Sequence, residues 1–370
     1  MDAMSAGTIR QWGFRPGFLE PGARNSITDV PGVKVGNWTL RDEKHNTGVT
    51  MIVPREDVYE HKCTAAAWVL NGYGKSAGIV QIQELGQLET PIALTNTLNV
   101  GLVSDALVEY TAQQCRRHGY ELRSVNPVVG ECNDAGLNTI TERVAGYAQV
   151  MEALNGASEE FESGCAGAGA GMTCHDLKGG IGSASRRIRT DDGDFMLGVL
   201  ALCNHGELRE LSICGRHVGP AIEERLRNLP KKAPKEGDEG SCILVLACDL
   251  PLSSRQLGRV VKRCGVGLAR CGSFWGHGSG DIVIGFTTAH DIRREEERTV
   301  LVQKIWNEDR LNDAFAAAAE CSEEAVLNAL SAAETTIGPD GRIRYALREF
   351  RELLSHGDAD SGSFPEPQGR

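Results

Sequence analysis

The segment KKAPKEGDEGSCILVLACD, Lys231 to Asp249, joins a polar stretch that cannot form a core to an unbroken apolar run. Prolines, glycines and mixed charges over residues 228–240 predict a mobile surface linker. The run Ile243 to Ala247 is continuous and does not alternate, which predicts a β-strand buried on both faces. The boundary is Gly240-Ser241, so Ser241 is expected at the mouth of a buried strand.

Gly240-Ser241 has two interpretations when it is taken alone. A Gly-Ser pair is a common turn before a strand. Alternatively, Ser241 is an N-terminal nucleophile that is released when the chain cuts itself, which needs a flexible segment before the bond, a rigid strand after it and a small residue at the cut. All three are present, but the dipeptide does not decide between the interpretations. A cysteine hydrolase using Cys242 is disfavoured, because the next side chain along a strand points to the opposite face.

The composition sets limits on the class of protein. A chain of 370 residues with 41% hydrophobic content can bury a large core, either as one large domain or as two. Only 5% of the residues are aromatic while 44 are glycine, which favours packed sheets with close turns. The net charge of -11 offers no basic face for phosphates, so no nucleic-acid partner is expected.

Twelve cysteines are scattered without a Cys-x-x-Cys or His-x-x-x-His pattern, so no metal site is predicted and most cysteines are expected to be small buried side chains. The first residues, MDAMSAGTIRQWGF, are not a basic start followed by an apolar stretch, and the apolar runs are too short to span a bilayer. We therefore expect a cytoplasmic protein without a membrane partner. The glycine-rich segment Gly164 to Met172 fits no nucleotide-binding motif, so its glycines are expected to let a loop approach a strand or a substrate. No cofactor is predicted.

Apolar spacing and turn residues predict strands early in the chain and helices later. Leu311 to Ala333 is expected to form two helices broken near Cys321-Ser322, because a serine followed by two glutamates is typical of an N-cap with an acidic first turn. The tail 356–370 is expected to be disordered. The other predicted elements are strands at Val30–Gly36 and Gly48–Val53 and helices at Ser104–Ala112 and Ala221–Arg227.

Eight short stretches between Asn25 and Gly341 carry a family resemblance. They are Ile27–Gly36; Leu70–Gly74; Pro91–Thr97 with Val100-Gly101; Pro127–Glu131 with Asn133-Asp134; Lys178–Gly182; Asn204 before Gly206; Gly240-Ser241; and Gly278–Asp281. In this order they resemble the self-processing serine aminopeptidases, peptidase family S58, which includes DmpA-type L-aminopeptidase/D-amidase and the beta-peptidyl aminopeptidases. Each stretch is weak alone, and their shared order is specific.

The resemblance implies an α/β fold, a four-layer αββα sandwich like that of the N-terminal nucleophile hydrolases. It also implies that residues 1–370 form a single domain, and that the chain cuts itself into an alpha fragment, 1–240, and a beta fragment, 241–370. The implied activity is that of an aminopeptidase or amidase, which releases N-terminal amino acids from small peptides, amides or esters. Members of the family assemble from several processed protomers, so a homo-oligomer is expected.

The resemblance also assigns roles to residues. Ser241 is the implied nucleophile, first toward the carbonyl of Gly240 and then toward substrates. A serine hydroxyl needs a base, and its own freed α-amine, with an unperturbed pKa of roughly 7.7 to 8.0, is tethered beside it. Asn204 matches the asparagine that helps to hold the oxyanion, for which an amide is a suitable donor. Ser279 and Asp281 match a Ser-x-acid pair that orients the serine and its amine.

Glu131 matches a glutamate that holds the free amine of the substrate's first residue, which explains selection for aminopeptidase substrates. Two departures from the family pattern concern the neighbouring loops. Asn133, a candidate substrate-binding residue, stands where some relatives have a tyrosine that contributes to the oxyanion site, so that donor is either missing or replaced by an amide. Lys75 stands where an acid is commoner, which leaves the shape of the first loop open.

Two functions from other classes remain open at this point. One is a self-processing acyltransferase of the ornithine acetyltransferase kind, whose usual nucleophile is threonine. The other is a non-catalytic binding scaffold with the same fold, against which the intact set Ser241, Asn204, Ser279 and Asp281 argues.

Overall fold

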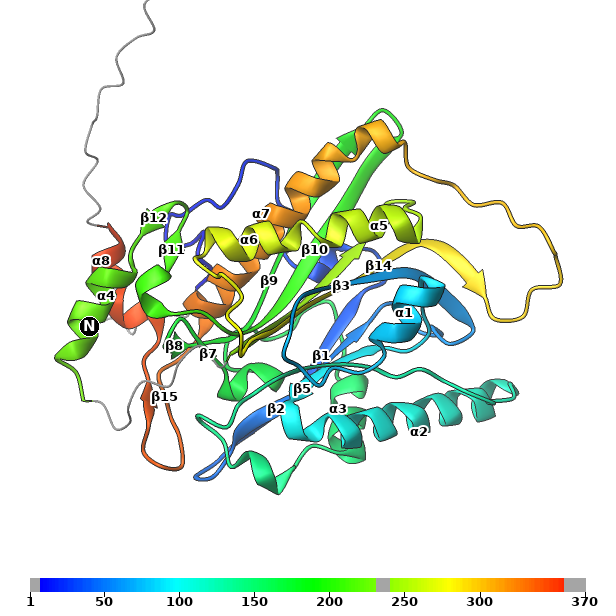
Figure 1. The fold of residues 1–370 in the computed structure, drawn as a ribbon. Helices are drawn as coiled ribbons and strands as arrows, with labels where there is room; N and C mark the ends of the chain where they lie inside the picture. The colour runs from blue at the N-terminus through cyan, green and yellow to red at the C-terminus, as the bar shows by residue number, and fades with distance from the viewer. Residues whose placement is uncertain (1–6, 231–239, 356–370) are drawn as a thin grey trace, which may run out of the picture.

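The computed structural model describes residues 7–230 and 240–355. Within them, two β-sheets pack face to face, and helices cover the outer face of each sheet (Figure 1). The predicted four-layer αββα sandwich is therefore confirmed. Its layers are built from segments that alternate along the chain, so strands from both ends of the sequence share the larger sheet.

The two sheets have six and four strands among the described residues. The larger sheet has the order β4 (Gln87–Leu88), β3 (His61–Gly72), β14 (Gly280–Arg293), β13 (Ser241–Cys248), β10 (Gly193–Asn204) and β9 (Gly180–Thr190). The smaller has the order β1 (Lys34–Arg41), β2 (Asn46–Val53), β5 (Ile92–Asn96) and β6 (Val128–Cys132). Short two-stranded ribbons are formed by β7 (Thr173–Cys174) with β8 (Leu177–Lys178), β11 (Ser212–Ile213) with β12 (Arg216–His217), and β15 (Thr336–Ile337) with β16 (Ile343–Arg344).

The helices are divided between the two outer faces (Figure 1). The larger sheet is covered by α5 (Ser254–Val261), α6 (Cys264–Arg270) and α7 (Asn312–Ala332). The smaller sheet is covered by α2 (Val100–His118) and α3 (Tyr147–Asn155). The remaining α-helices of the described chain are α1 (Ile79–Leu85), α4 (Gly219–Arg227) and α8 (Arg351–Ser355).

Three hydrophobic cores fill the three spaces between these layers. The first joins the larger sheet to its helices and includes Leu244 and Leu327. The second lies between the sheets and includes Leu94 and Ile243. The third joins the smaller sheet to its helices and includes Leu107. Burial of apolar surface in three adjacent cores is the main stabilising term of such a sandwich.

β13 occupies the centre of the larger sheet, and every one of its residues is buried. Its side chains alternate between the two cores on either side, since Ile243 faces the other sheet and Leu244 faces the helices. The predicted strand buried on both faces is confirmed. β13 runs parallel to β14 and antiparallel to β10, so its first residue lies at one edge of the sandwich with a partner on each side.

The prediction of two helices broken near residue 321 is wrong, because α7 is one unbroken helix over Asn312–Ala332. The hydroxyl of Ser322 caps no helix and donates to the carbonyl oxygen four residues earlier (2.7 Å). The acidic residues lie in the buried middle of the helix. There Arg186 of β9 donates to Glu324 (2.7 Å), and Arg270 of α6 pairs with Glu323 (3.2 Å), so partners distant in sequence offset both charges.

Most other predicted elements are confirmed. The strand at Gly48–Val53 lies in β2, and the helices at Ser104–Ala112 and Ala221–Arg227 lie in α2 and α4. The predicted strand Val30–Gly36 begins only at its fifth residue. Gly32 adopts a positive φ of 86°, and this turn delays the start of β1.

The glycine-rich segment forms the 3-10 helix η4 (Gly167–Gly171) between β2 and β9. A Cβ on Gly171 would lie 2.3 Å from the carbonyl oxygen of Asn46, and one on Gly169 would lie 2.5 Å from that of Gly164. Side chains do not fit at these distances. The expectation that these glycines allow a loop to pass close to a strand is confirmed.

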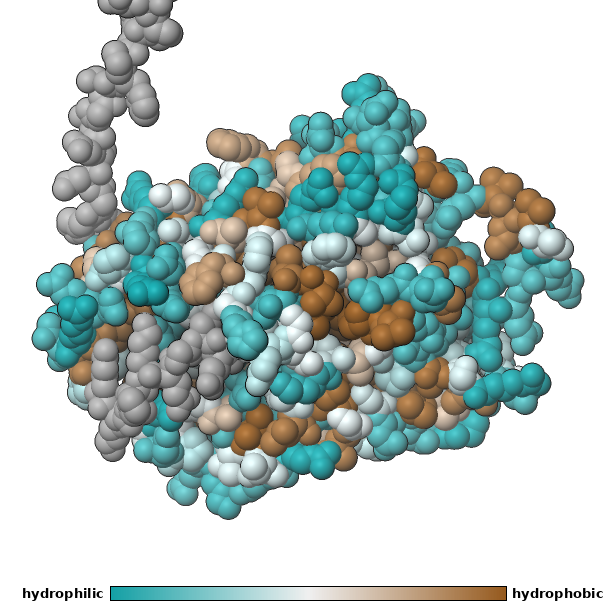
Figure 2. Space-filling view, viewed as in Figure 1, coloured by the Kyte–Doolittle hydropathy of each residue, from teal (hydrophilic) through white to brown (hydrophobic). Residues whose placement is uncertain are grey.

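Residues 231–239 of the predicted linker and the predicted tail 356–370 lie outside the described residues. In the described chain, no helix is both long enough and apolar enough to cross a membrane. Hydrophilic side chains cover much of the face in Figure 2, with hydrophobic side chains in separate patches. Between β14 and α7, the segment 294–311 protrudes from the body (Figure 1). We call it the β14–α7 segment.

Candidate active site

Ser241 is the first residue of β13, and its backbone partners are Asn204 at the end of β10 and Gly280 at the start of β14. Side chains two apart on a strand share a face, so Ser241 faces the core between the sheets, as Ile243 does. Asn204 is directly opposite Ser241 and therefore shares that face. Both residues are buried. The strand pairing thus brings the predicted nucleophile and the predicted oxyanion donor together.

Gly240, which precedes β13, packs against the backbone of the neighbouring strand end. A Cβ at this position would lie 2.1 Å from the carbonyl oxygen of Asn204 and 2.7 Å from the Cα of His205. Its carbonyl oxygen accepts a hydrogen bond from the backbone N–H of Gly280 (3.3 Å). Only glycine fits here, so steric contact with the neighbouring strand end explains why the residue before Ser241 is small.

The side-chain amide of Asn204 is held in one orientation. Its Oδ1 accepts a hydrogen bond from the backbone N–H of Thr173 (2.7 Å). A backbone N–H can only donate, so the contacting atom of the amide must be its oxygen. The NH₂ group is therefore directed away from Thr173 and can donate to another acceptor on the Ser241 face.

Ser279 and Asp281 flank the position opposite Ser241, because Gly280 is the register partner of Ser241. Both side chains are buried, and the hydroxyl of Ser279 has no hydrogen-bond partner among the described residues. The side chain of Asn71 on β3 fixes the turn before β14. Its amide donates to the carbonyl oxygens of Gly276 (3.0 Å) and Ser279.

Glu131 reaches this site from β6 of the other sheet. Its Oε1 accepts from the backbone N–H of Lys75 (2.8 Å), and its Oε2 accepts from the hydroxyl of Thr97. A Cβ on Gly74 would lie 3.5 Å from Glu131 Oε1 and 3.7 Å from the Cα of Gly280, so Gly74 lies between the carboxylate and the strand start beside Ser241. The carboxylate retains lone pairs for a further donor.

The loop after β6 places the two residues Asn133 and Asp134 differently. Asn133 is exposed, and its Oδ1 accepts from the backbone N–H of Ala135 (2.9 Å). Asp134 is buried and accepts from Thr47 (2.6 Å) and Asn138 (3.0 Å). Burial raises the pKa of Asp134 to about 6, against the opposing effect of these hydrogen bonds.

The departure at Lys75 leaves the carboxylate contact intact. The loop uses the backbone N–H of Lys75, and the ammonium group lies 4.6 Å from the ring centroid of Tyr73. A backbone donor is available from any residue except proline at this position. The side chain can therefore differ from the family without changing how Glu131 is held.

Two other ionisable groups lie beside the site but are poorly suited to the chemistry. Burial raises the pKa of the Cys242 thiol to about 12, so it is not a thiolate at neutral pH. Burial, together with the neighbouring His175, lowers the pKa of His205 to about 3. His205 is therefore neutral across the pH range in which a base could titrate. Cys242 directly follows Ser241, and His205 directly follows Asn204. Both side chains therefore point to the opposite face of the sheet from Ser241 and Asn204.

Two stacked sheets between helical layers, with a serine at the first position of a central strand, define the class of N-terminal nucleophile hydrolases. The chain matches the sequence profile of peptidase family S58 over residues 25–344, and it belongs to that family. It is a peptidase of the aminopeptidase type.

Named relatives support this assignment. The chain is 33% identical over 344 residues to the beta-peptidyl aminopeptidase BapA of Sphingosinicella xenopeptidilytica, covering 88% of this chain and 85% of the relative. A beta-aminopeptidase structure from Burkholderia sp. is 38% identical, with a TM-score of 0.85 and coverage of 94% and 97%. The L-aminopeptidase D-Ala-esterase/amidase structure from Ochrobactrum anthropi, a variant of the Ntn hydrolase fold, is 31% identical, with a TM-score of 0.85 and coverage of 94% and 98%.

Four contacts of the site were not predicted from the sequence. Asn71 and Thr97 lie in stretches that carry the family resemblance, but the resemblance assigns no role to them. The backbone donors of Lys75 and Thr173 have no side-chain signature, so only the fold identifies them. The burial of Glu131 and its distance along the chain from Ser241 likewise become meaningful only when the two sheets are stacked.

Proposed function

We propose that this protein cuts its own Gly240–Ser241 bond and then uses Ser241 as an N-terminal nucleophile to release N-terminal residues from small peptides, amides and esters. The observation that carries the proposal is the position of Ser241. It opens the central strand and pairs with Asn204, and the linker before it ends at a glycine that packs on the Asn204 backbone. Cleavage would give fragments 1–240 and 241–370.

In the proposed self-cleavage, the Ser241 hydroxyl attacks the carbonyl carbon of Gly240, and the acyl group moves from nitrogen to oxygen. Water then hydrolyses the ester, which leaves Gly240 as a carboxylate and Ser241 with a free α-amine. In each later turnover that amine accepts the hydroxyl proton as Ser241 forms an ester with the substrate acyl group. The substrate's leaving group takes up the proton, and water regenerates the serine.

Asn204 is the proposed oxyanion donor. The hydrogen bond from Thr173 to its Oδ1 directs the NH₂ group toward other acceptors, and a fixed donor needs no reorganisation when charge develops. Asn133 is proposed to take part in the same region where relatives carry a tyrosine. Its exposed position after β6 supports a contact with substrate and gives no support for a buried donor.

Ser279 and Asp281 are proposed to orient the new α-amine. Both flank the residue opposite Ser241, and the Ser279 hydroxyl is buried with no hydrogen-bond partner among the described residues. Such a hydroxyl is costly unless another group satisfies it. An amine that exists only after cleavage would supply that partner, which supports a role in the processed enzyme.

Glu131 is proposed to bind the substrate's free amine. Its carboxylate is positioned by Lys75 and Thr97 and lies across Gly74 from the strand start beside Ser241. The names of the relatives cover beta-peptides, L-amino acids and D-alanine esters and amides. We therefore propose the substrate class that they share, in which a free amine stands close to the scissile carbonyl.

A homo-oligomer of processed protomers is also proposed. The β14–α7 segment exposes Val300, Leu301, Val302 and Ile305, and Val302 is 99% exposed. Apolar side chains on a protruding segment favour contact with a second copy of the chain. Light scattering during size-exclusion chromatography should give a multiple of the 39.8 kDa protomer mass. The cytoplasm is the proposed compartment, in accord with the twelve free cysteines.

The test is mass spectrometry of the purified protein with N-terminal sequencing of the smaller fragment. That fragment should begin Ser-Cys-Ile-Leu. Ser241→Ala should stay uncut, and hydrolysis of aminoacyl p-nitroanilides should fall by roughly 10⁴-fold or more. Cys248→Ala, on the same strand, is the matched control and should be cut.

A whole wild-type chain that still hydrolyses these substrates would contradict the amine mechanism. The acyltransferase alternative is tested by adding an amine acceptor to the same assay. Acyl transfer to the acceptor in place of hydrolysis would favour it. A chain that is neither cut nor active would instead support the binding scaffold.

A further inference from the structure

Five cysteine and histidine side chains gather on the helix-facing side of the larger sheet, directly behind the Ser241–Asn204 pair. They form two groups that share His205, and in each group the potential ligand atoms lie within 4.8 Å of one another. One group is Cys174, His175 and His205, and the other is Cys203, His205 and Cys242. We call these five residues the Cys/His cluster. All five are buried.

Strand pairing sets the position of the Cys/His cluster. Cys203 and Cys242 are directly opposite each other, one residue along from the Asn204–Ser241 pair. Alternation along a strand therefore sends the two sulfurs to the opposite face from Asn204 and Ser241. Both sulfurs lie in the core between the larger sheet and its helices. The cluster and the active site are thus separated by the thickness of one sheet.

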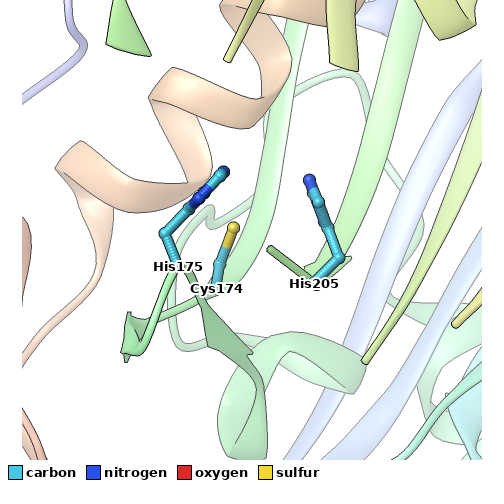
Figure 3. Close-up of side chains that lie close together, drawn as sticks. All are labelled: Cys174, His175 and His205. Atoms are coloured by element: carbon cyan, nitrogen blue, oxygen red, sulfur yellow. The ribbon is translucent and has the colours of Figure 1, made fainter. Parts of the chain in front are cut away.

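The β7–β8 hairpin brings the other group of ligands to His205. Its two-residue turn, His175-Asp176, has positive φ at both positions (49° and 57°), as in a type I′ turn. The backbone N–H of His175 donates to the carbonyl oxygen of His205 (2.7 Å), which fixes the hairpin against the end of β10. Figure 3 shows Cys174 between the two imidazole rings, with all three side chains pointing the same way.

His175 is held in the tautomer that a metal ligand needs. Its Nδ1 lies 3.0 Å from the carbonyl oxygen of Glu207, and a carbonyl can only accept, so Nδ1 carries the proton. The lone pair of the ring is then on Nε2. Histidine ligands of metals commonly donate their other ring N–H to a backbone carbonyl in this manner. A Cβ on Gly206 would lie 2.5 Å from the His175 ring, so glycine there allows the ring to pack.

His205 gives the strongest indication that a ligand belongs at this position. It is only 2% exposed, and neither of its ring nitrogens has a hydrogen-bond partner among the described residues. A buried polar atom without a partner costs about 1–3 kcal/mol. Two such atoms on one ring are therefore rare in a native core. A metal ion bound to one nitrogen would satisfy it with a bond stronger than a hydrogen bond.

We propose that the Cys/His cluster binds one thiophilic metal ion of the Zn²⁺ type, with Cys174, His175 and His205 as three ligands and one sulfur of the Cys203–Cys242 pair as the fourth. Zinc prefers four such ligands in a tetrahedron with bonds of about 2.0 to 2.3 Å. The ligand atoms of a tetrahedron with these bonds are roughly 3.3 to 3.8 Å apart. The ligand atoms of each group lie within 4.8 Å of one another, so any wider spacing must narrow when the ion binds.

Charge and proton balance are consistent with this assignment. Two thiols lose their protons to solvent when the ion binds, and two thiolates neutralise Zn²⁺ while the imidazoles stay neutral. A neutral complex can be buried in the apolar core at much lower cost than a net charge. Carboxylate-preferring ions such as Ca²⁺ and Mg²⁺ do not suit this set of sulfur and imidazole donors.

The site would connect parts of the chain that the proposed cleavage separates. Cys174, His175 and His205 lie in fragment 1–240, and Cys242 follows the proposed new N-terminus directly. An ion held by Cys242 would therefore cross-link the two fragments next to the nucleophile. The metal site itself does not depend on the cleavage, because all of its ligands are present in the uncut chain.

The test uses the full chain, unfolded with a reductant and a chelator and then refolded with Co²⁺ or Zn²⁺. Because the ligands are buried, refolding gives the ion access. One ion per chain is expected by elemental analysis, and the Co²⁺ form should show thiolate-to-cobalt charge-transfer absorption. Loss of a supporting hydrogen bond to a ligand costs about 10–100-fold in metal affinity, so His205→Ala and Cys174→Ala should each lose more than about 100-fold.

The matched control is Cys248→Ala, which removes a buried thiol from the same face of β13 outside the Cys/His cluster. It should bind Co²⁺ as the wild type does. A wild-type protein that refolds without charge-transfer absorption overturns the proposal, whatever the variants do. Absorption that persists in both His205→Ala and Cys174→Ala overturns the ligand assignment. Circular dichroism of each variant shows whether a loss of binding reflects the ligand or the fold.

Discussion

The two faces of the larger sheet differ sharply where β10 ends and β13 begins. On the face toward the smaller sheet, Ser241 and Asn204 present oxygen and amide groups, and Glu131 approaches from β6. On the face toward the helices, Cys203 and Cys242 present sulfur within a cluster that contains imidazoles. Adjacent residues of two strands therefore present two different sets of chemical groups. The period of two in a β-strand is enough to keep them apart.

The comparison also shows why the two faces differ in polarity. On the proposed active face, Ser241 and Asn204 lie at the strand ends at the sandwich edge, where a substrate and water would enter and leave. The helix-facing side is packed against α6 and α7, so polar groups there are buried in an apolar core. Buried donors on that side need a permanent partner, whereas those on the active face can be satisfied by a substrate. Substitutions on the two faces should consequently have separable effects.

The largest effect in this comparison is expected for Asn204→Ala on the active face. Removal of one oxyanion donor typically costs about 10²–10³-fold in kcat. The same loss should slow self-cleavage, because the Gly240 carbonyl passes through the same kind of tetrahedral state. Initial rates on an aminoacyl p-nitroanilide measure the first effect, and the fraction of uncut chain measures the second. A processed variant that loses less than about tenfold would exclude Asn204 as the oxyanion donor.

The sequence predicts one of these faces much better than the other. Ser241, Asn204 and Glu131 lie in short contiguous stretches that resemble a family, so the sequence alone is enough to propose their roles. The continuous apolar run after Ser241 also predicts the central strand. Both signals are local in sequence. The structure adds that the stretches containing Ser241, Asn204 and Glu131 lie close together in space.

The Cys/His cluster could not be predicted in this way. Its members come from a hairpin, the end of β10 and the start of β13, with no spacing that is typical of a metal site. The wrongly predicted break in α7 has the same origin. Glu324 looks like part of an exposed helix start until Arg186, far away in sequence, is seen to pair with it. Both the cluster and the unbroken helix depend on contacts between residues far apart in the chain. Such contacts cannot be predicted from the pattern of a single sequence.

A smaller effect is expected for Glu131→Gln, which keeps the shape of the side chain but removes its charge. Hydrolysis of substrates with a free amine should fall by about 10–100-fold in kcat/KM, the range of a lost charge-assisted hydrogen bond of about 1.5–3 kcal/mol. Self-cleavage should continue, because the Gly240 acyl group has no free amine nearby. Comparing the two rates in one preparation is the measurement. Equal losses would mean that Glu131 supports the fold and not substrate recognition.

Asp134, in the loop after β6, offers a test of how pH affects the stability of the fold. Its pKa in the folded protein is about 6, above an ordinary value of 3.8, so the folded state favours the protonated form. Its stabilising contribution is complete below pH 3.8 and is lost as the pH rises through 6. The total is at most about 3 kcal/mol.

Asp134→Asn removes this titration and keeps the size of the side chain. We expect the fall in the free energy of unfolding between pH 4 and 7 to become shallower by up to about 3 kcal/mol. Denaturant titrations in the uncut Ser241→Ala background give a single chain to compare. An unchanged pH dependence would mean that Asp134 keeps an ordinary pKa and that its hydrogen bonds with Thr47 and Asn138 offset its burial.

The smallest effect is expected for the pH dependence of catalysis when His205, on the helix-facing side, is replaced. The proposed base is the α-amine of Ser241, which must be neutral to accept a proton, so activity should fall on the acid side. His205 has a pKa of about 3 and is neutral throughout that range. His205→Gln should therefore leave the midpoint of the acid limb where the wild type has it, even if the rate itself changes. The measurement is kcat/KM against pH for both proteins. Disappearance of the acid limb in the variant would make His205 the titrating base, and the separation of the two faces would fail together with the amine mechanism.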